Sequence, residues 1–151
     1  MERMTKQLAD ARQCGVYHLV RKPEEVERDA EEAGLAVFRI DIRHTKSKKD
    51  FLAQVAGALR FPDWFGKNWD ALNDCLTDLD WLSTETGYVL ILENSEHFGT
   101  LHPQEFEEAM AVFAAAADYW KSENRPFWVF IEGSSKWDSG LRKWPTSARS
   151  R

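Results

Sequence analysis

The chain has 151 residues, of which 43% are hydrophobic and 30% are charged, and its formal net charge is −5. This length suits one domain with a real core and is too short for two, and the composition is ordinary for a soluble globular protein. No apolar run approaches the ~20 residues that cross a bilayer, and residues 1–6 are not followed by the apolar stretch of a signal peptide, so we expect a cytoplasmic protein.

The N-terminal region predicts a small extension with one strand and one helix. Residues 1–14 are polar, with apolar positions too sparse for a stripe, so we expect a frayed or weakly helical arm. Residues 16–20 predict a short strand. Pro23 at a first helical position, glutamates in the first turns and a glycine stop predict a surface helix over residues 23–33.

The next segments predict a strand and a capped helix. Residues 35–42 begin as a continuous apolar run and end in alternation, which favours a mostly buried strand. Ser47, with Asp50 three residues later, resembles a capping box and predicts a helix that ends near Arg60.

Residues 61–81 concentrate the unusual composition of the chain. They hold three of the seven tryptophans, and five aspartates against one lysine. From Asn68 onward the apolar residues recur at helical spacing, which predicts a stripe that faces a core. The same spacing gathers four polar side chains on the opposite, solvent-facing side: Asp70, Asn73, Asp74 and Thr77.

The carboxylates of Asp70 and Asp74 stand four residues apart, and such a like-charge pair costs roughly 0.2–0.5 kcal/mol in a helix. One interpretation is that acids near the helix N-terminus interact favourably with the helix dipole and keep the surface soluble. The other is a binding face. Aromatic residues at the entrance of a helix, beside paired carboxylates, are typical of a patch that docks on a cationic partner.

Three further elements complete the predicted fold. Residues 88–92 predict a buried strand. Pro103 begins a helix whose apolar residues recur every three or four positions and which ends at Pro126. Residues 127–131 predict the last strand. Strands that alternate with helices and read as continuous apolar runs predict an α/β fold with a parallel sheet and helical crossovers.

The last segment, residues 134–151, is serine-rich, lacks a hydrophobic period and carries five bases against one acid. We expect a flexible tail, and we expect that removal of residues 136–151 leaves the domain folded. The alternative is a basic arm, with Trp137 and Trp144, that touches nucleic acid or folds back on the acidic face. Both interpretations stay open at the level of the sequence.

No pattern in the sequence indicates catalysis or metal binding. Cys14 and Cys75 lie far apart and are expected to be free thiols. The four histidines show no ligand spacing and are expected on the surface or in loops. Catalysis by Asp70 and Asp74 is disfavoured, because both would stay ionised on an open acidic face, and this charge also disfavours direct nucleic-acid binding by the folded domain. We therefore expect a protein without enzyme activity, metal or cofactor.

Residues 64–77 read WFGKNWDALNDCLT, a run that closely resembles the signature segment of the barstar family of intracellular ribonuclease inhibitors. The resemblance covers roughly residues 35–131 and implies a barstar-like fold, with a small parallel sheet of three to four strands packed by helices. It divides the chain into an N-terminal extension (1–34), a barstar-like domain (35–133) and the basic tail (134–151). The strand of the extension is then expected at an edge of the sheet.

The resemblance also implies a function, which is one-to-one binding of a basic microbial ribonuclease or related toxin domain. The implied partner-binding residues are Trp64, Phe65, Gly66, Asn68, Asp70, Asn73, Asp74 and Thr77. In this set the two carboxylates take the place of RNA phosphates and the aromatic pair excludes water. Asn68 and Thr77 are expected to add hydrogen bonds at the edge of the contact.

The segment departs from the prototype of the family at several positions. Asn73 replaces a tryptophan between the two aspartates, Lys67 replaces an acid, and Asp78 and Leu79 replace glycine and tryptophan. Ala115 falls where the prototype has a contacting glutamate on a later helix. These departures leave three functions open: an inhibitor of a ribonuclease, an immunity protein against a related toxin domain, or a regulatory protein-interaction module that no longer binds a nuclease.

Overall fold

The computed structural model describes residues 3–62, 68–79, 82 and 86–145. Within these residues, five strands form one sheet in the order β2-β3-β4-β1-β5, and their pairings are parallel. The strands are β1 (Val16–Leu19), β2 (Ala36–Asp41), β3 (Tyr88–Glu93), β4 (Phe127–Ile131) and β5 (Lys143–Trp144). The predicted α/β class with a parallel sheet is confirmed, and the sheet is larger than the three to four strands expected.

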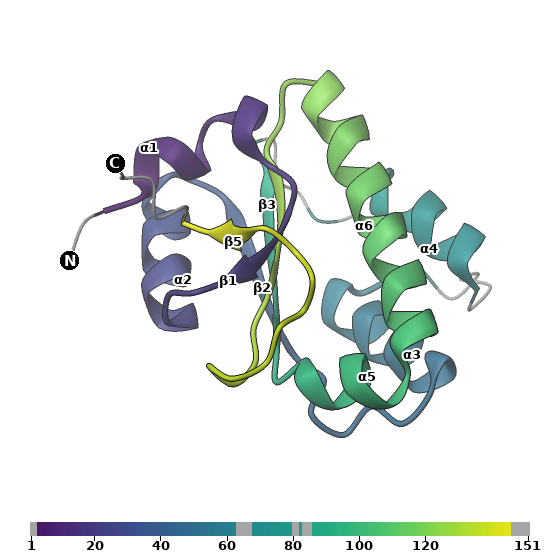
Figure 1. The fold of residues 1–151 in the computed structure, drawn as a ribbon. Coiled ribbons are helices and arrows are strands. Elements are labelled where there is room, and N and C mark those ends of the chain that lie inside the picture. The colour runs from purple at the N-terminus through teal and green to yellow at the C-terminus, as the bar shows by residue number, and fades with distance from the viewer. Residues whose placement is uncertain (1–2, 63–67, 80–81, 83–85, 146–151) are drawn as a thin grey trace.

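Helices cover both faces of the sheet (Figure 1). One face carries α1 (Thr5–Leu8) and α2 (Pro23–Glu32), with a short 3-10 helix (Ala11–Gln13) between α1 and β1. The other face carries α3 (Lys48–Leu59), α4 (Trp69–Leu76), α5 (Glu96–Leu101) and α6 (Pro103–Ser122). This layering explains the continuous apolar runs of the central strands, because a strand covered on both faces has no solvent side.

Alternate side chains of the central strands enter cores on opposite faces of the sheet. In β3, Leu90 and Leu92 belong to the core under α3, α4 and α6, whereas Val89 and Ile91 belong to the core under α1 and α2. All four side chains are 0% exposed. Trp128 of β4 joins the second core in the same way.

The capping signals in the sequence are confirmed. The Ser47 hydroxyl accepts a hydrogen bond from the Asp50 N–H at 3.1 Å, and α3 ends at Arg60, whose φ of 56° lies in the left-handed region. Pro23 and Pro103 stand in the first turns of α2 and α6, where a missing N–H costs little.

The N-terminal arm contains α1 and is tied to the core. Leu8 is 0% exposed, and its carbonyl accepts a hydrogen bond from Trp128 Nε1 at 2.8 Å. The backbone N–H of Met4 donates to the buried carboxylate of Asp29 on α2 at 2.9 Å. Met4 and Leu8 are two apolar residues one helical turn apart, and two positions give too weak a period for the sequence to predict this attachment.

We expected the N-terminal strand at an edge of the sheet, and this expectation was wrong. β1 lies between β4 and β5, and Tyr17, His18 and Leu19 are buried, so the expectation of a surface or loop position was wrong for His18. β2 is an edge strand instead, and of its residues only Ile40 is buried. Arg39 of β2 makes ion pairs with glutamates of α2 and β3, so the expectation of a mostly buried strand was also wrong.

Residues 134–145 are packed on the domain, which differs from the flexible tail that we expected. Lys143–Trp144 form β5 beside β1, and Trp144 is 4% exposed. Trp137 lies so close to Gly99 and Gly133 that a Cβ added at either glycine would come within 2.6 Å of its ring. Each tryptophan is an isolated apolar residue in a polar segment, so no periodicity could indicate these contacts.

Candidate protein-binding face on helix α4

The orientation of α4 is fixed by its cap and by its apolar side. The Asn68 side-chain oxygen accepts a hydrogen bond from the Ala71 N–H at 2.7 Å and caps the helix. Leu72, Cys75 and Leu76 are each 0% exposed in the core between the sheet and α6. The predicted apolar stripe is therefore confirmed.

The opposite side of α4 carries two open carboxylates. Asp70 and Asp74 are exposed, whereas Asn73 and Thr77 are half-buried at the margin of this face. Asp70 and Asp74 stand at i and i+4 and so lie on the same side of the helix. We call the exposed surface around Asp70 and Asp74 the acidic face.

These carboxylates differ from many other acids of the molecule in their lack of a cationic partner. Asp10 pairs with Arg12, Asp29 pairs with Arg28, and several glutamates pair with arginines. Within the described part of the chain, neither Asp70 nor Asp74 makes an ion pair. The acidic face therefore presents negative charge that no ion pair among these residues neutralises.

The two residues expected to bond with a partner at the edge of the face already have roles in the helix. The Asn68 oxygen serves the cap, which leaves its amide NH₂ for a partner. The Thr77 hydroxyl donates to the carbonyl of Asn73 at 2.9 Å, which leaves its oxygen to accept. Contact with a partner remains a prediction for both side chains.

The aromatic part of the predicted site lies outside the described residues, because these exclude Trp64, Phe65 and Gly66. Sequence reasoning did not assign a role to Trp69, the first residue of α4. Its Nε1 donates to Glu108 of α6 at 2.8 Å, and the Lys48 ammonium lies 5.0 Å from its ring centre. Trp69 precedes Leu72 and Leu76 by three and seven positions, a helical spacing that places it on the flank of the apolar stripe.

Helix α6 packs beside α4 and supports it from the core side. Ala115 of α6 is exposed, so the position aligned with the contacting glutamate of the prototype is on the surface and has no carboxylate. Glu108, which holds Trp69, is a different acid of the same helix. Its contact joins residues 39 positions apart, and no local sequence pattern could have indicated it.

The thiol of Cys75 lies behind the acidic face and does not suit nucleophilic chemistry. Burial raises its pKa, and the nearby charges of Asp74 and Asp78 raise it further. Among the residues that the structure describes, no group of three or more His, Cys, Asp or Glu side chains is placed to hold a metal ion. No helix in this described part has the length and apolar character that crossing a membrane requires.

The fold and this helix define an α/β protein that carries an open acidic helix beside a parallel sheet. The family model described as Barstar (barnase inhibitor) matches residues 35–132, which is well over half of the chain. The protein therefore belongs to the barstar family. The segments that provide α1, α2, β1 and β5 lie outside the match.

Chains of two solved structures match this chain at low sequence identity. A chain in the structure of Drosophila ORC bound to DNA matches with a TM-score of 0.52 and 15% identity, over 91% of this chain and 80% of that chain. A chain in the structure of Drosophila ORC bound to AT-rich DNA and Cdc6 matches with a TM-score of 0.47 and 15% identity, over 86% of this chain and 45% of that chain. At this identity the first likeness concerns the fold alone. A comparison with curated proteins finds no match.

Proposed function

We propose that this protein inhibits a basic ribonuclease, or a related toxin domain, by binding it one-to-one through the acidic face and the preceding segment that contains Trp64 and Phe65. The observation that carries the proposal is the pair of exposed carboxylates, Asp70 and Asp74, on one side of a capped and packed helix, with no ion pair to either among the described residues. Membership of a family described as barnase inhibitors supports the same function.

The proposed mechanism is electrostatic mimicry of RNA. A ribonuclease binds phosphates through Arg, Lys and His side chains, and a carboxylate offers the same charge and the same hydrogen-bond acceptors. Two carboxylates one turn apart would occupy neighbouring cation sites. The aromatic pair would then shield these contacts from water and strengthen them, because charges attract more strongly at low dielectric.

A rigid helix reduces the entropic cost of this binding. The cap at Asn68 and the buried Leu72 and Leu76 hold α4 in one position before any partner arrives. Trp69 is held from a second side by Glu108. A preorganised surface loses less conformational freedom on association, so more of the electrostatic attraction is retained as affinity.

A titration of ribonuclease activity tests the proposal. The purified protein is added to barnase and to other small basic microbial ribonucleases, and cleavage of a fluorogenic RNA is followed. We expect the activity of at least one of these enzymes to disappear at equimolar protein. We also expect Asp70→Asn and Asp74→Asn each to weaken the inhibition by roughly 10- to 100-fold, because each removes a charged hydrogen bond worth about 1.5–3 kcal/mol.

Glu31→Gln is the matched control, because Glu31 is exposed on α2, on the other face of the sheet. This variant should inhibit as the unmodified protein does. Binding without inhibition would contradict the proposal and favour the regulatory module, and equal loss in the Glu31 control would show that net charge, rather than the acidic face, sets the affinity.

A further inference from the structure

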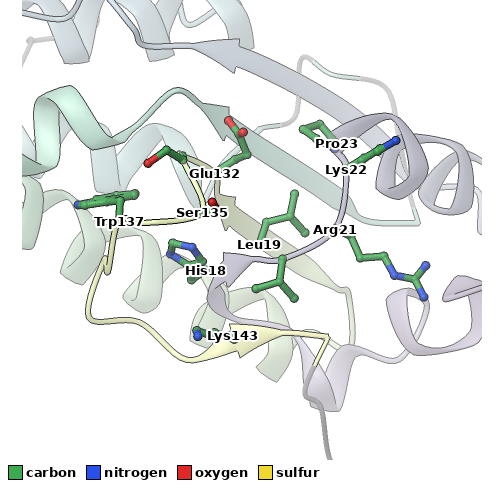
Figure 2. A pocket seen from close by; sticks show the side chains of 12 residues that line it. His18, Leu19, Arg21, Lys22, Pro23, Glu132, Ser135, Trp137 and Lys143 are labelled. Atoms are coloured by element: carbon green, nitrogen blue, oxygen red, sulfur yellow. The ribbon is translucent and has the colours of Figure 1, made fainter.

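A cavity of about 380 Å³ opens at the carboxyl ends of β1 and β4, and none of its lining residues belongs to α4 (Figure 2). We call it the switch-point cavity. Its walls are residues 18–23, which end β1 and begin α2, and residues 132–135, which follow β4. Trp137 and Lys143 complete the lining.

The topology of the sheet explains why a cavity forms here. β1 and β4 are parallel neighbours, so their carboxyl ends meet at one edge of the sheet. After β1 the chain turns to α2, whose Val26 and Ala30 are buried in the core on one face. After β4 it turns to the other face, where the Trp137 ring packs against Phe106 of α6 at 5.8 Å. Adjacent strands whose connections leave to opposite faces create a crevice, and ligands of open parallel sheets bind in such crevices.

The cavity carries positive charge in a chain whose net charge is −5. Lys22 and Lys143 are exposed at its walls, and neither makes an ion pair within the described residues. The neighbouring Arg21 pairs with Glu25 of α2 at 3.8 Å. Glu132 also lines the cavity and contributes one negative charge, and its carboxylate accepts a hydrogen bond from the Asn94 N–H at 2.8 Å.

His18 of β1 adds an imidazole ring to the wall of the cavity. Its Nδ1 lies 2.7 Å from the Ser139 hydroxyl oxygen, which also accepts from the Leu141 N–H at 3.3 Å. In the tautomer in which the Ser139 hydroxyl donates to Nδ1, the neutral imidazole carries its proton on Nε2. Burial, and then the charge of Lys143, lower the pKa of His18, which keeps the ring neutral at neutral pH.

His18 and Lys143 lie side by side, because they are paired residues of β1 and β5 (Figure 2). The Trp137 ring stands 5.6 Å from the imidazole on the other side. The wall therefore combines an ammonium group, a neutral N–H and an aromatic surface, and Lys22 lies across the cavity from them.

We propose that the switch-point cavity binds a small phosphate-bearing molecule, with its phosphate beside the Lys143 ammonium and in reach of His18, and with Lys22 as a second positive charge at the far wall. Lysine ammonium groups bind phosphate as point charges, and a neutral imidazole N–H donates without adding charge. The volume is within the range of small-molecule sites, so the cavity has room for an organic group beside the phosphate, against Trp137.

Two-dimensional NMR titrations with adenosine monophosphate test the proposal, with inorganic phosphate and uncharged adenosine as comparison probes. We expect saturable shifts at the Ser135 and Lys143 amides and at the Trp137 indole with the monophosphate, smaller ones with inorganic phosphate, and none with adenosine. The double variant Lys22→Gln/Lys143→Gln should bind the monophosphate at least about tenfold more weakly, because it removes two positive charges from the cavity walls. Lys49→Gln, which removes an exposed lysine of α3, should bind it as the unmodified protein does.

Ser135→Asp provides a second test that leaves the core intact, because Ser135 is exposed at the cavity wall. A carboxylate at this position should abolish the shifts by repelling the phosphate. The proposal is overturned if about 10 mM monophosphate, roughly ten times a weak Kd of about 1 mM, gives no saturable shift at the cavity. It is also overturned if the lysine double variant or Ser135→Asp binds the monophosphate as the unmodified protein does.

Discussion

The indole of Trp120 donates a hydrogen bond of 2.7 Å to the backbone carbonyl of Leu76, and this contact ties the last turn of α4 to α6. Both residues are buried, with exposed fractions of 5% and 0%. A carbonyl in the last turn of a helix lacks a partner within the helix, so the indole satisfies an acceptor that burial would otherwise leave unpaired. The position of the acidic face thus depends on a side chain of a different helix.

Trp120→Phe should lower the free energy of unfolding by about 1–3 kcal/mol, because it leaves the buried Leu76 carbonyl without a donor. Urea denaturation followed by circular dichroism measures this change. The control is Tyr119→Phe, since Tyr119 is 43% exposed and its ring is kept; its effect should stay within about 0.5 kcal/mol. Equal stability of the two variants would show that the indole hydrogen bond does not hold α4.

Replacing Asp70 and Asp74 together by asparagine should leave the fold intact and raise the free energy of unfolding by a few tenths of a kcal/mol, because the change relieves a like-charge pair. Calorimetric melting at low salt measures this effect. Adding salt should reduce the difference, since exposed charges are screened. An unfolded or strongly destabilised double variant would show that the two carboxylates serve the structure of α4.

Trp144→Ala should destabilise the domain by about 3–5 kcal/mol, because it empties a site that is 4% exposed in the core beside Trp128 and Phe130. Removal of residues 136–151 should destabilise it at least as much, in contrast to our expectation from the sequence. The control is Lys136→Ala at an exposed position. If the truncated protein had the same melting temperature as the full-length chain, β5 would contribute nothing to stability.

The stability should depend on pH through His18. Burial lowers its pKa in the folded state below the usual value of 6.5, and Lys143 lowers it further, whereas Asp138 and Glu132 act in the opposite direction. As the pH falls below about 6.5, the unfolded chain therefore takes up a proton before the folded protein does, and the free energy of unfolding decreases. Above this pH the contribution of His18 is fully present.

Urea denaturation between about pH 8 and pH 5 measures this dependence. His18→Gln should flatten the profile, and His44→Gln, at an exposed position, should leave it unchanged. An equally steep loss of stability in His18→Gln would place the responsible group elsewhere.

The parts of the fold that the sequence could predict are those with local causes. The burial of Leu72 and Leu76 follows from helical spacing, which acts within a few residues. The side of α4 that bears Asp70 and Asp74 follows from the same spacing. These features define most of the acidic face without any knowledge of the tertiary structure.

The parts that the sequence could not predict depend on contacts between distant segments. A short apolar run identifies β1 as a strand, but its neighbours are chosen by packing, and β5 consists of only two residues. The hydrogen bond between Trp69 and Glu108 likewise leaves no mark on the local pattern. The switch-point cavity arises from strand order, so the roles of Lys22 and Lys143 become visible only in the folded chain.

Carboxyl labelling of the protein with a carbodiimide and an amine, alone and in complex with an inhibited ribonuclease, tests most directly whether the acidic face is the binding surface. Mass spectrometry then gives the labelling rate of each carboxylate. We predict that Asp70 and Asp74 become protected in the complex, while Glu31 on the other face of the sheet reacts at its free rate. Labelling of Asp70 and Asp74 at their free rates in an intact complex would contradict the account and place the interface on another surface.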